Sequence, residues 1–226
     1  MIPVEILSQV GTPVTALTQI AFQCQRCGVC CRNRAGAPII LTGYDVYQIG
    51  RALGVRSTMD LLSMGIIGVV SNQYEMPTCI LAINETGACC LLDGDRCMVH
   101  DAKPVVCALY PLGRAYDATD NRYIYIQPHD NKCIGTGMGE KALVSQWLAQ
   151  TGVVQKEQYY AAYEQAYAEA VMASLDARTP KYRRKIYLRT VWALIGGYNP
   201  RKPYLQQLAD NMECLRPLLQ RATRKQ

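Results

Sequence analysis

The chain has 226 residues, of which half are apolar and 19% are charged, so it can bury a core and is not extensively disordered. Residues 1–10 lack the basic start and long apolar stretch of an export signal, so we expect a cytoplasmic protein. Residues 61–70, the longest apolar run, contain Ser63, Gly65 and Gly68 and are too short to span a bilayer. Eleven cysteines then favour metal binding or catalysis over disulfides, because the cytosol keeps thiols reduced.

A dense group of thiols comes first along the chain. Four cysteines fall within eight residues, in the order Cys24, Cys27, Cys30 and Cys31. Cysteines three residues apart can direct their sulfur atoms to one centre, and Gly28 permits the left-handed backbone that such a turn often needs. This C-x2-C-x2-C-C run therefore predicts a site for a soft metal, either zinc or iron–sulfur.

The next segments have the patterns of short regular elements. Residues 38–42 form an apolar run that predicts a strand, and residues 44–53 have helical spacing that ends at a glycine. Ser57 is a suitable N-cap for a further helix over residues 58–64. Asp45, near the start of the first helix, can act either as a cap or as a functional acid.

A second group of cysteines lies on predicted turns and loops: Cys89, Cys90, Cys97, Cys107 and Cys133. Residues 93–95, Asp-Gly-Asp, predict a hairpin turn that returns Cys89 or Cys90 toward Cys97. Pro104 and Pro111 restrict the backbone on either side of Cys107. Metal ligands in small folds are usually presented from such short loops.

The composition changes at residues 135–139, where three glycines lie close together. We place a domain boundary there, with a cysteine-rich metal-binding domain over residues 1–139 and a helical region over residues 140–226. A strand is predicted over residues 122–127. The expected fold class is α+β, in which an irregular, metal-centred domain of short strands and helices precedes a mostly helical region.

Helical spacing predicts four helices in the second part: residues 140–150, 156–177, 181–195 and 204–219, the last bent at Pro217. Tyr160, Tyr163, Tyr167 and Val171 recur at intervals of three and four residues, which is typical of a packing face. The net charge of +6 is concentrated in this part, with six lysines and arginines among residues 178–189. We expect a solvated helix face or a protein partner there, whereas nothing specific supports nucleic-acid binding.

Taken as a set, the cysteine motifs resemble the YkgJ-type cysteine-cluster family, whose members are described as zinc- or iron-chelating. The family's C-x-x-C-G-x-C-C opening matches residues 24–31, and its apolar-Thr-x-x-Asp stretch matches residues 41–45. Its later motifs match three segments: residues 89–93, residues 97–111 around Cys107, and residues 133–135. The resemblance covers about residues 22 to 140.

Some positions depart from the family pattern. His100 stands where a tyrosine is usual, Lys103 where an arginine is usual, and Cys90 is additional. Cys79 and Cys214 have no counterpart, so we expect buried thiols that pack as small apolar side chains. For His100 and His129, we expect hydrogen-bonded or surface roles rather than metal ligation.

The resemblance leaves eight expected ligands: Cys24, Cys27, Cys30, Cys31, Cys89, Cys97, Cys107 and Cys133. A zinc site or a cubane cluster takes four thiolates, so eight fit two centres, or one centre with additional thiols. Neighbouring side chains diverge, so Cys30 and Cys31 serve different centres or one of them serves none. Three evenly spaced cysteines in one run resemble a ferredoxin-type loop, which favours an iron–sulfur cluster, [4Fe–4S], over the alternative, Zn²⁺.

Three functions follow from these observations. The first is an iron–sulfur protein that acts in electron transfer or redox maturation, and the second is a zinc-chelating protein that is structural or binds a partner. The third is an iron–sulfur-dependent protein methyltransferase, because the family includes a flagellin lysine N-methylase, although no methyl-donor motif is visible. The sequence contains no clear nucleophile–base pair or carboxylate pair, so no catalytic residue is assigned.

Overall fold

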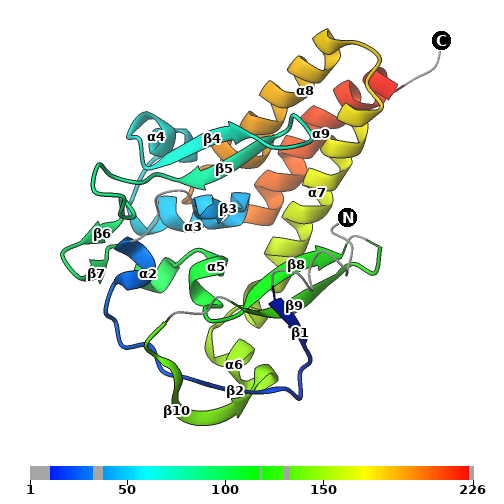
Figure 1. The fold of residues 1–226 in the computed structure, drawn as a ribbon. Helices are drawn as coiled ribbons and strands as arrows, with labels where there is room; N and C mark the ends of the chain where they lie inside the picture. The colour runs from blue at the N-terminus through cyan, green and yellow to red at the C-terminus, as the bar shows by residue number, and fades with distance from the viewer. Residues whose placement is uncertain (1–10, 33–37, 118, 130–132, 224–226) are drawn as a thin grey trace.

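The computed structural model describes residues 11–32, 38–117, 119–129 and 133–223. The prediction about the first ten residues lies outside this part of the chain. Small antiparallel sheets and short helices make up the first part of the fold, and long helices dominate the last (Figure 1). The predicted α+β class with a mostly helical C-terminal region is confirmed.

Small antiparallel sheets pair the beginning of the chain with much later segments. Their strands are β1 (Gly11–Val14), β2 (Gln19–Phe22), β8 (Gly113–Asp117), β9 (Arg122–Pro128) and β10 (Thr136–Leu143). Strand β9 lies between β1 and β8, and β10 pairs with β2. The strand predicted over residues 122–127 is therefore confirmed, as the centre of a sheet.

A further sheet has the order β3-β5-β4 and lies beside two short helices. These elements are β3 (Ile40–Leu41), α3 (Gly43–Ala52), α4 (Thr58–Ser63), β4 (Ile67–Ser71) and β5 (Pro77–Leu81). Each helix begins with a capping box, Thr42 with Asp45 in α3 and Ser57 with Asp60 in α4. Both predicted helices and the Ser57 cap are confirmed.

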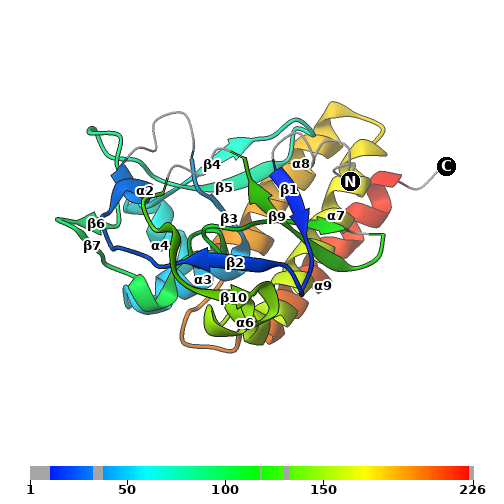
Figure 2. The same cartoon turned by 60° about the horizontal axis from the view of Figure 1, so that its bottom comes forward.

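The elements that carry or flank the cysteines of the two groups are short. They are α2 (Val29–Arg32), β6 (Leu92–Asp93), β7 (Arg96–Cys97), the 3-10 turn η1 (His100–Ala102) and α5 (Val105–Ala108). Figures 1 and 2 both place α2 beside the β6–β7 hairpin. The Asp-Gly-Asp turn forms that hairpin as predicted, with Gly94 at a positive φ of 55°.

Long helices form the other side of the molecule. They are α6 (Val144–Gln150), the 3-10 turn η2 (Val154–Lys156), α7 (Glu157–Leu175), α8 (Pro180–Val191), the π-helical turn η3 (Trp192–Gly196) and α9 (Tyr204–Thr223). Helices α7, α8 and α9 lie side by side in both views. Helix α9 continues through Pro217 and ends four residues later than predicted.

The single helix predicted over residues 140–150 is wrong in its first four residues. Residues 140–143 belong to β10, where Lys141 pairs with Ala21 and Leu143 pairs with Gln19. Gly137 and Gly139 have positive φ values of 79° and 81°, which do not suit a helix. Pairing with β2 therefore overrides the local helical pattern, and α6 begins only at Val144.

The buried side chains form two clusters. The helical cluster includes Tyr160 and Tyr163 of the predicted tyrosine stripe, Ile186, Leu208 and Met212. The cysteine-side cluster consists of Ile39, Leu41, Val46, Ile49, Leu61, Ile67, Cys79, Leu81, Cys89, Leu91, Val99 and Ile195. Cys31, Cys90, Cys97 and Cys107 pack against the edge of this second cluster. The tyrosine stripe is thus a packing face, as predicted.

Residues on both sides of the proposed boundary share the helical cluster, which contains Tyr44 and Leu109 as well as Tyr160 and Leu208. The division into residues 1–139 and 140–226 stays a prediction. Among the described helices, none is both long enough and apolar enough to cross a bilayer.

Candidate metal centre

The first cysteine loop leads from β2 into α2. Gly28 has a φ of 69°, and its carbonyl accepts hydrogen bonds from the backbone N–H groups of Cys31 (2.9 Å) and Arg32 (3.0 Å). A Cβ atom at Gly28 would lie 2.8 Å from Nη1 of Arg32. The positive φ agrees with the glycine predicted for its conformational freedom, and the Arg32 side chain folds over it.

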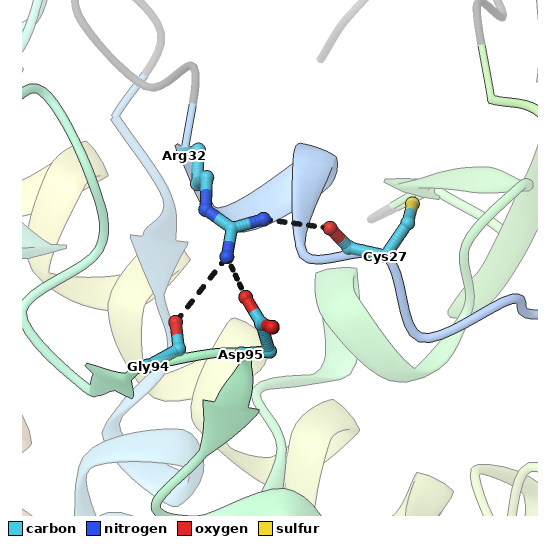
Figure 3. A network of polar contacts seen from close by, with 4 residues as sticks. All are labelled: Cys27, Arg32, Gly94 and Asp95. Atoms are coloured by element: carbon cyan, nitrogen blue, oxygen red, sulfur yellow. Dashed lines mark hydrogen bonds and ion pairs between the residues drawn. The ribbon is translucent and has the colours of Figure 1, made fainter.

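Arg32 connects the first cysteine loop to the β6–β7 turn (Figure 3). Its Nη1 donates to the carbonyl of Cys27 (2.7 Å), and its Nη2 donates to the carbonyl of Gly94 (3.3 Å) and pairs with the carboxylate of Asp95. The sulfur of Cys27 points away from the guanidinium in this view. The sequence analysis did not predict this contact. The only indication in the sequence is that Arg32, next to Cys31, and Asp95, in the later turn, carry opposite charges.

The second cysteine group meets the first through the backbone. The N–H of Cys89 donates to the carbonyl of Cys31 at 2.7 Å, and the β6–β7 hairpin then brings Cys97 opposite Leu92. Cys89 is buried with 6% of its surface exposed, whereas Cys31 and Cys97 are half-buried. The hairpin supports the predicted return of Cys89 or Cys90 toward Cys97, and the charge of Cys89 acts on Cys97.

Cys107 enters from α5, which lies where the two buried clusters meet. Val105 and Leu109, on either side of Cys107, belong to the helical cluster, while Cys107 packs against the cysteine-side cluster. The backbone N–H of Cys107 donates to the carbonyl of Pro104 at 2.9 Å. Helix α5 therefore presents a half-buried thiol toward the other cysteines from a well-packed support.

Electrostatic interactions connect these thiols. The hydrogen bond with Cys30 raises the pKa of Cys31, as do burial and the charges of Cys30, Cys89 and Cys107. The two adjacent sulfur atoms, of Cys30 and Cys31, are 3.9 Å apart. Burial raises the pKa of Cys97, and the charges of Cys89 and Cys30 raise it further. We call Cys30, Cys31, Cys89, Cys97 and Cys107 the inner thiols.

The inner thiols suit a soft metal because they supply sulfur donors at the edge of an apolar cluster. Bringing several thiolates together without a cation is unfavourable, as the raised pKa values of Cys31 and Cys97 indicate. In the described part of the chain, no three Cys, His, Asp or Glu side chains already form a group able to hold a metal ion. The ligand assignment therefore stays a prediction, and binding requires the thiols to draw closer.

Of the remaining predicted ligands, Cys24 and Cys133 lie at the β2–β10 end, whereas Cys27 lies in the loop that Arg32 connects to the β6–β7 turn. Gln23 donates its backbone N–H to the carbonyl of Gly135 (3.1 Å), next to the paired strands β2 and β10. Cys24 directly follows the first of these paired segments, and Cys133 lies just before the second. The N–H of Gly135 lies 3.4 Å from the sulfur of Cys133, within hydrogen-bonding distance for sulfur. Cys24 is exposed, and Cys27 and Cys133 are half-buried. We call Cys24, Cys27 and Cys133 the outer thiols.

The other cysteines have distinct environments. Cys79 is fully buried in β5, where burial raises its pKa, so the prediction of a packing thiol is confirmed. The same prediction is wrong for Cys214, which is exposed because α9 turns Met212 and Leu215 toward the core instead. Cys90 is half-buried, and its thiol donates to the carbonyl of Ile66 at 3.4 Å.

Both histidines are exposed at the surface. A ring nitrogen of His129, Nε2, lies 3.3 Å from the hydroxyl of Thr12. Burial lowers the pKa of His100, and the nearby charges of Lys103 and Arg26 lower it further. These positions agree with the predicted surface or hydrogen-bonded roles.

Comparison with known proteins identifies the cysteine region. No curated protein and no solved structure matches the chain. One family model does match, over residues 23–133: CxxCxxCC, described as "Putative zinc- or iron-chelating domain". The matched segment begins one residue before Cys24 and ends at Cys133, so it spans both cysteine groups. Residues 23–133 therefore match this family of zinc- or iron-chelating domains, as the cysteine motifs predicted.

Proposed function

We propose that the inner thiols hold an iron–sulfur cluster, [4Fe–4S], and that the protein acts in electron transfer or redox maturation. The observation that carries this proposal is the approach of three separate segments, α2, the region from Cys89 to Cys97, and α5, to one edge of the cysteine-side cluster. A cubane takes four thiolates, and Cys31, Cys89, Cys97 and Cys107 come from these segments. The sulfur of Cys30 lies 3.9 Å from that of Cys31, so either of these adjacent thiols can supply the α2 ligand and the other is the fifth, additional thiol.

Two features favour iron–sulfur over zinc. The run of Cys24, Cys27 and Cys30 is evenly spaced, as in cubane-binding loops, rather than paired as in C-x2-C zinc knuckles, and it contributes Cys30 to the inner thiols. The inner thiols other than the exposed Cys30 also belong to, or pack against, the apolar cluster that contains Leu91 and Val99. Such burial tunes the potential of a cluster, whose chemistry would be the exchange of single electrons.

Anaerobic purification followed by iron, zinc and acid-labile sulfide analysis tests the proposal. We expect iron and sulfide in equal amounts in the wild-type protein and a clear loss of both in Cys107→Ser. The matched control is Cys214→Ser, since that thiol is exposed on α9, away from the site. Zinc without sulfide would replace the proposal with a structural zinc site, and wild-type protein free of metal would refute both.

The outer thiols decide how many centres there are. Cys24→Ser and Cys133→Ser should leave the inner cluster in place if it is complete with the inner thiols alone. Loss of half of the iron in both variants would instead indicate a second centre that these thiols share. Loss of all the iron in both would show that the inner and outer thiols serve one centre.

We propose further that the basic face of α8 binds an acidic protein partner. Lys181, Arg183, Arg184, Lys185 and Arg189 are exposed along this helix, and Arg183 is 3.8 Å from Glu75. Binding of poly-glutamate and of an RNA oligonucleotide to wild-type protein and to Arg184→Glu compares the two acidic ligands. Tighter binding of RNA than of poly-glutamate, or no change in Arg184→Glu, would overturn this choice.

A further inference from the structure

Two helices in the first part of the chain begin with the same capping box but in different environments. In α4, the carboxylate of Asp60 accepts from the backbone N–H groups of Ser57 (3.0 Å) and Arg56 (3.1 Å), and its contacts are confined to the start of its own helix. In α3, Asp45 makes the equivalent contact with Thr42, whose N–H donates to Oδ2 at 2.9 Å. A cap alone requires no more than this.

Asp45 differs from Asp60 in its burial. The Asp45 residue has 1% of its surface exposed, whereas Asp60 is half-buried. A fully buried carboxylate is unfavourable unless hydrogen bonds or opposite charges compensate it. The capping contact uses Oδ2, so the contacts of the other oxygen, Oδ1, indicate what else Asp45 does.

The Oδ1 atom of Asp45 reaches the cysteine site. It accepts the backbone N–H of Val105 at 2.8 Å, and Val105 is the first residue of α5. The N-cap residue of α5 is Pro104, whose side chain cannot form a capping hydrogen bond. Asp45, sixty positions earlier in the chain, therefore satisfies the backbone donor that lies two residues before Cys107.

Two further contacts hold the carboxylate in place. The hydroxyl of Tyr160 on α7 donates to Oδ1 at 3.3 Å. Burial raises the pKa of Asp45, whereas the hydrogen bonds from Thr42 and Val105 and the positive charge of Arg114 on β8 oppose this rise. The guanidinium of Arg114 lies over the ring of Tyr160, 4.3 Å from its centroid, and over the ring of Tyr123, 3.9 Å from its centroid. Helix α7 therefore holds Oδ1 through a hydrogen bond, and β8 places a compensating charge nearby.

We propose that Asp45 is a positioning residue of the metal site, which holds α5 so that Cys107 faces the other inner thiols. This inference rests on the proposed function, because it assigns Asp45 a role toward a thiolate-bound metal. It also explains why the aspartate of this capping box is fully buried, whereas that of the second box is not. Metal ligands are commonly oriented by hydrogen-bonded neighbours whose loss lowers metal affinity.

Anaerobic Co²⁺ titration of the metal-free full chain tests this role. The thiolate-to-cobalt charge-transfer band reports the bound thiolates, and competition with a chelator gives the affinity. We expect Asp45→Ala to weaken Co²⁺ binding by about 10–100-fold and to alter the band. Val105→Pro removes the N–H donor at the first helical position, where proline is tolerated, and should weaken binding similarly. Because both variants break one hydrogen bond, their effects on affinity should not add.

Two control variants separate positioning from helix capping. Asp60→Ala removes the same cap from α4. Thr42→Ala removes from α3 the hydroxyl that accepts from the N–H of Asp45 and donates to Oδ2 at 2.8 Å, but it leaves Oδ1 of Asp45 on Val105. Both should retain the wild-type Co²⁺ affinity and band.

The outcomes distinguish the two proposals. Equal affinity and an unchanged band in Asp45→Ala, or an equal loss of affinity in Asp60→Ala, would overturn the positioning role. Should Asp45→Ala fail to fold, Val105→Pro decides alone, and wild-type affinity in that variant would refute the inference. A wild-type chain that gives no thiolate-to-cobalt band would refute the proposed function instead.

Discussion

The helical region and the cysteine region of this chain achieve order by different means. The helical cluster is lined along α7, α8 and α9 by tyrosines, leucines and alanines that are almost completely buried. The cysteine-side cluster is smaller, and half-buried thiols on α2, β7 and α5 form part of its edge. Apolar burial stabilises the first region, while the elements that carry the thiols are too short to bury much surface.

This difference indicates where a metal contributes most. Helix α2 has no buried residue, and the β6–β7 hairpin has only two paired positions. A two-stranded hairpin is at best marginally stable by itself. Bonds from several thiolates to one metal centre would join these segments, so we expect metal binding to complete the fold of the cysteine region. The following predictions test this contrast, from the largest expected effect to the smallest.

Metal removal should affect the two regions unequally. After anaerobic chelation, we expect the backbone amides of Cys31, Cys89 and Cys97 to lose most of their protection from hydrogen exchange, because they lie in short elements. Amides inside α7 and α9 should keep theirs. Hydrogen exchange with mass spectrometry measures both in one sample, and uniform loss across the chain would contradict the contrast.

Shortening a buried side chain in the helical cluster should lower the stability of the protein without releasing its metal. Ile186 of α8 is fully buried, so Ile186→Ala leaves a cavity and should lower the free energy of unfolding by about 2–5 kcal/mol. We expect the metal content of the folded protein to stay at the wild-type level. Chemical unfolding followed by circular dichroism gives the first quantity and metal analysis gives the second. Loss of metal from the folded variant would show that the two regions are not separable in this way.

A half-buried carboxyl on α7, that of Glu164, should make the stability depend on pH. Burial raises the pKa of Glu164 from its ordinary 4.5 to about 7, with the charge of Arg114 opposing this shift. The folded protein then binds a proton more tightly than the unfolded chain, so the free energy of unfolding falls as pH rises from 4.5 to 7. The loss is on the order of 1–3 kcal/mol.

The variant Glu164→Gln removes this titration. Unfolding by urea at several pH values between 5 and 7.5 should show a shallower decline for the variant than for the wild type. Because acid also weakens metal–thiolate bonds in both proteins, the difference between the two is the informative quantity. Identical slopes would show that Glu164 ionises normally.

The smallest effect is expected at the contact between Arg32 and Asp95. Both side chains are substantially exposed, at 42% and 77%, so Asp95→Ala should lower the free energy of unfolding by less than about 1 kcal/mol. Asp120→Ala breaks the exposed pair with Arg122 (3.1 Å) and is the matched control away from the thiols. We expect both variants to retain their metal, because a backbone hydrogen bond still links Cys89 to Cys31. Metal loss in Asp95→Ala alone would show that the side-chain contact holds the loops together.

Local patterns in the sequence predicted the elements whose causes are local. The Ser57 cap, the Asp-Gly-Asp turn and the left-handed Gly28 each depend on residues within one turn of the chain. Helix α7 and its tyrosine face follow from a period of three to four residues. Residues 140–143 and Cys214 were mispredicted, because strand pairing in the first case and packing of α9 in the second decided their environment.

The sequence by itself determined the chemistry of the site. Its cysteine motifs supply sulfur donors and match a family of zinc- or iron-chelating domains. Tertiary structure decided which thiols approach one another, separating the inner thiols from the outer ones. It also decided that Asp45 reaches Val105 across sixty positions, although Asp60 has the same local pattern. The physical reason is that spacing constrains neighbours along the chain, whereas contacts between distant segments depend on how the whole core packs.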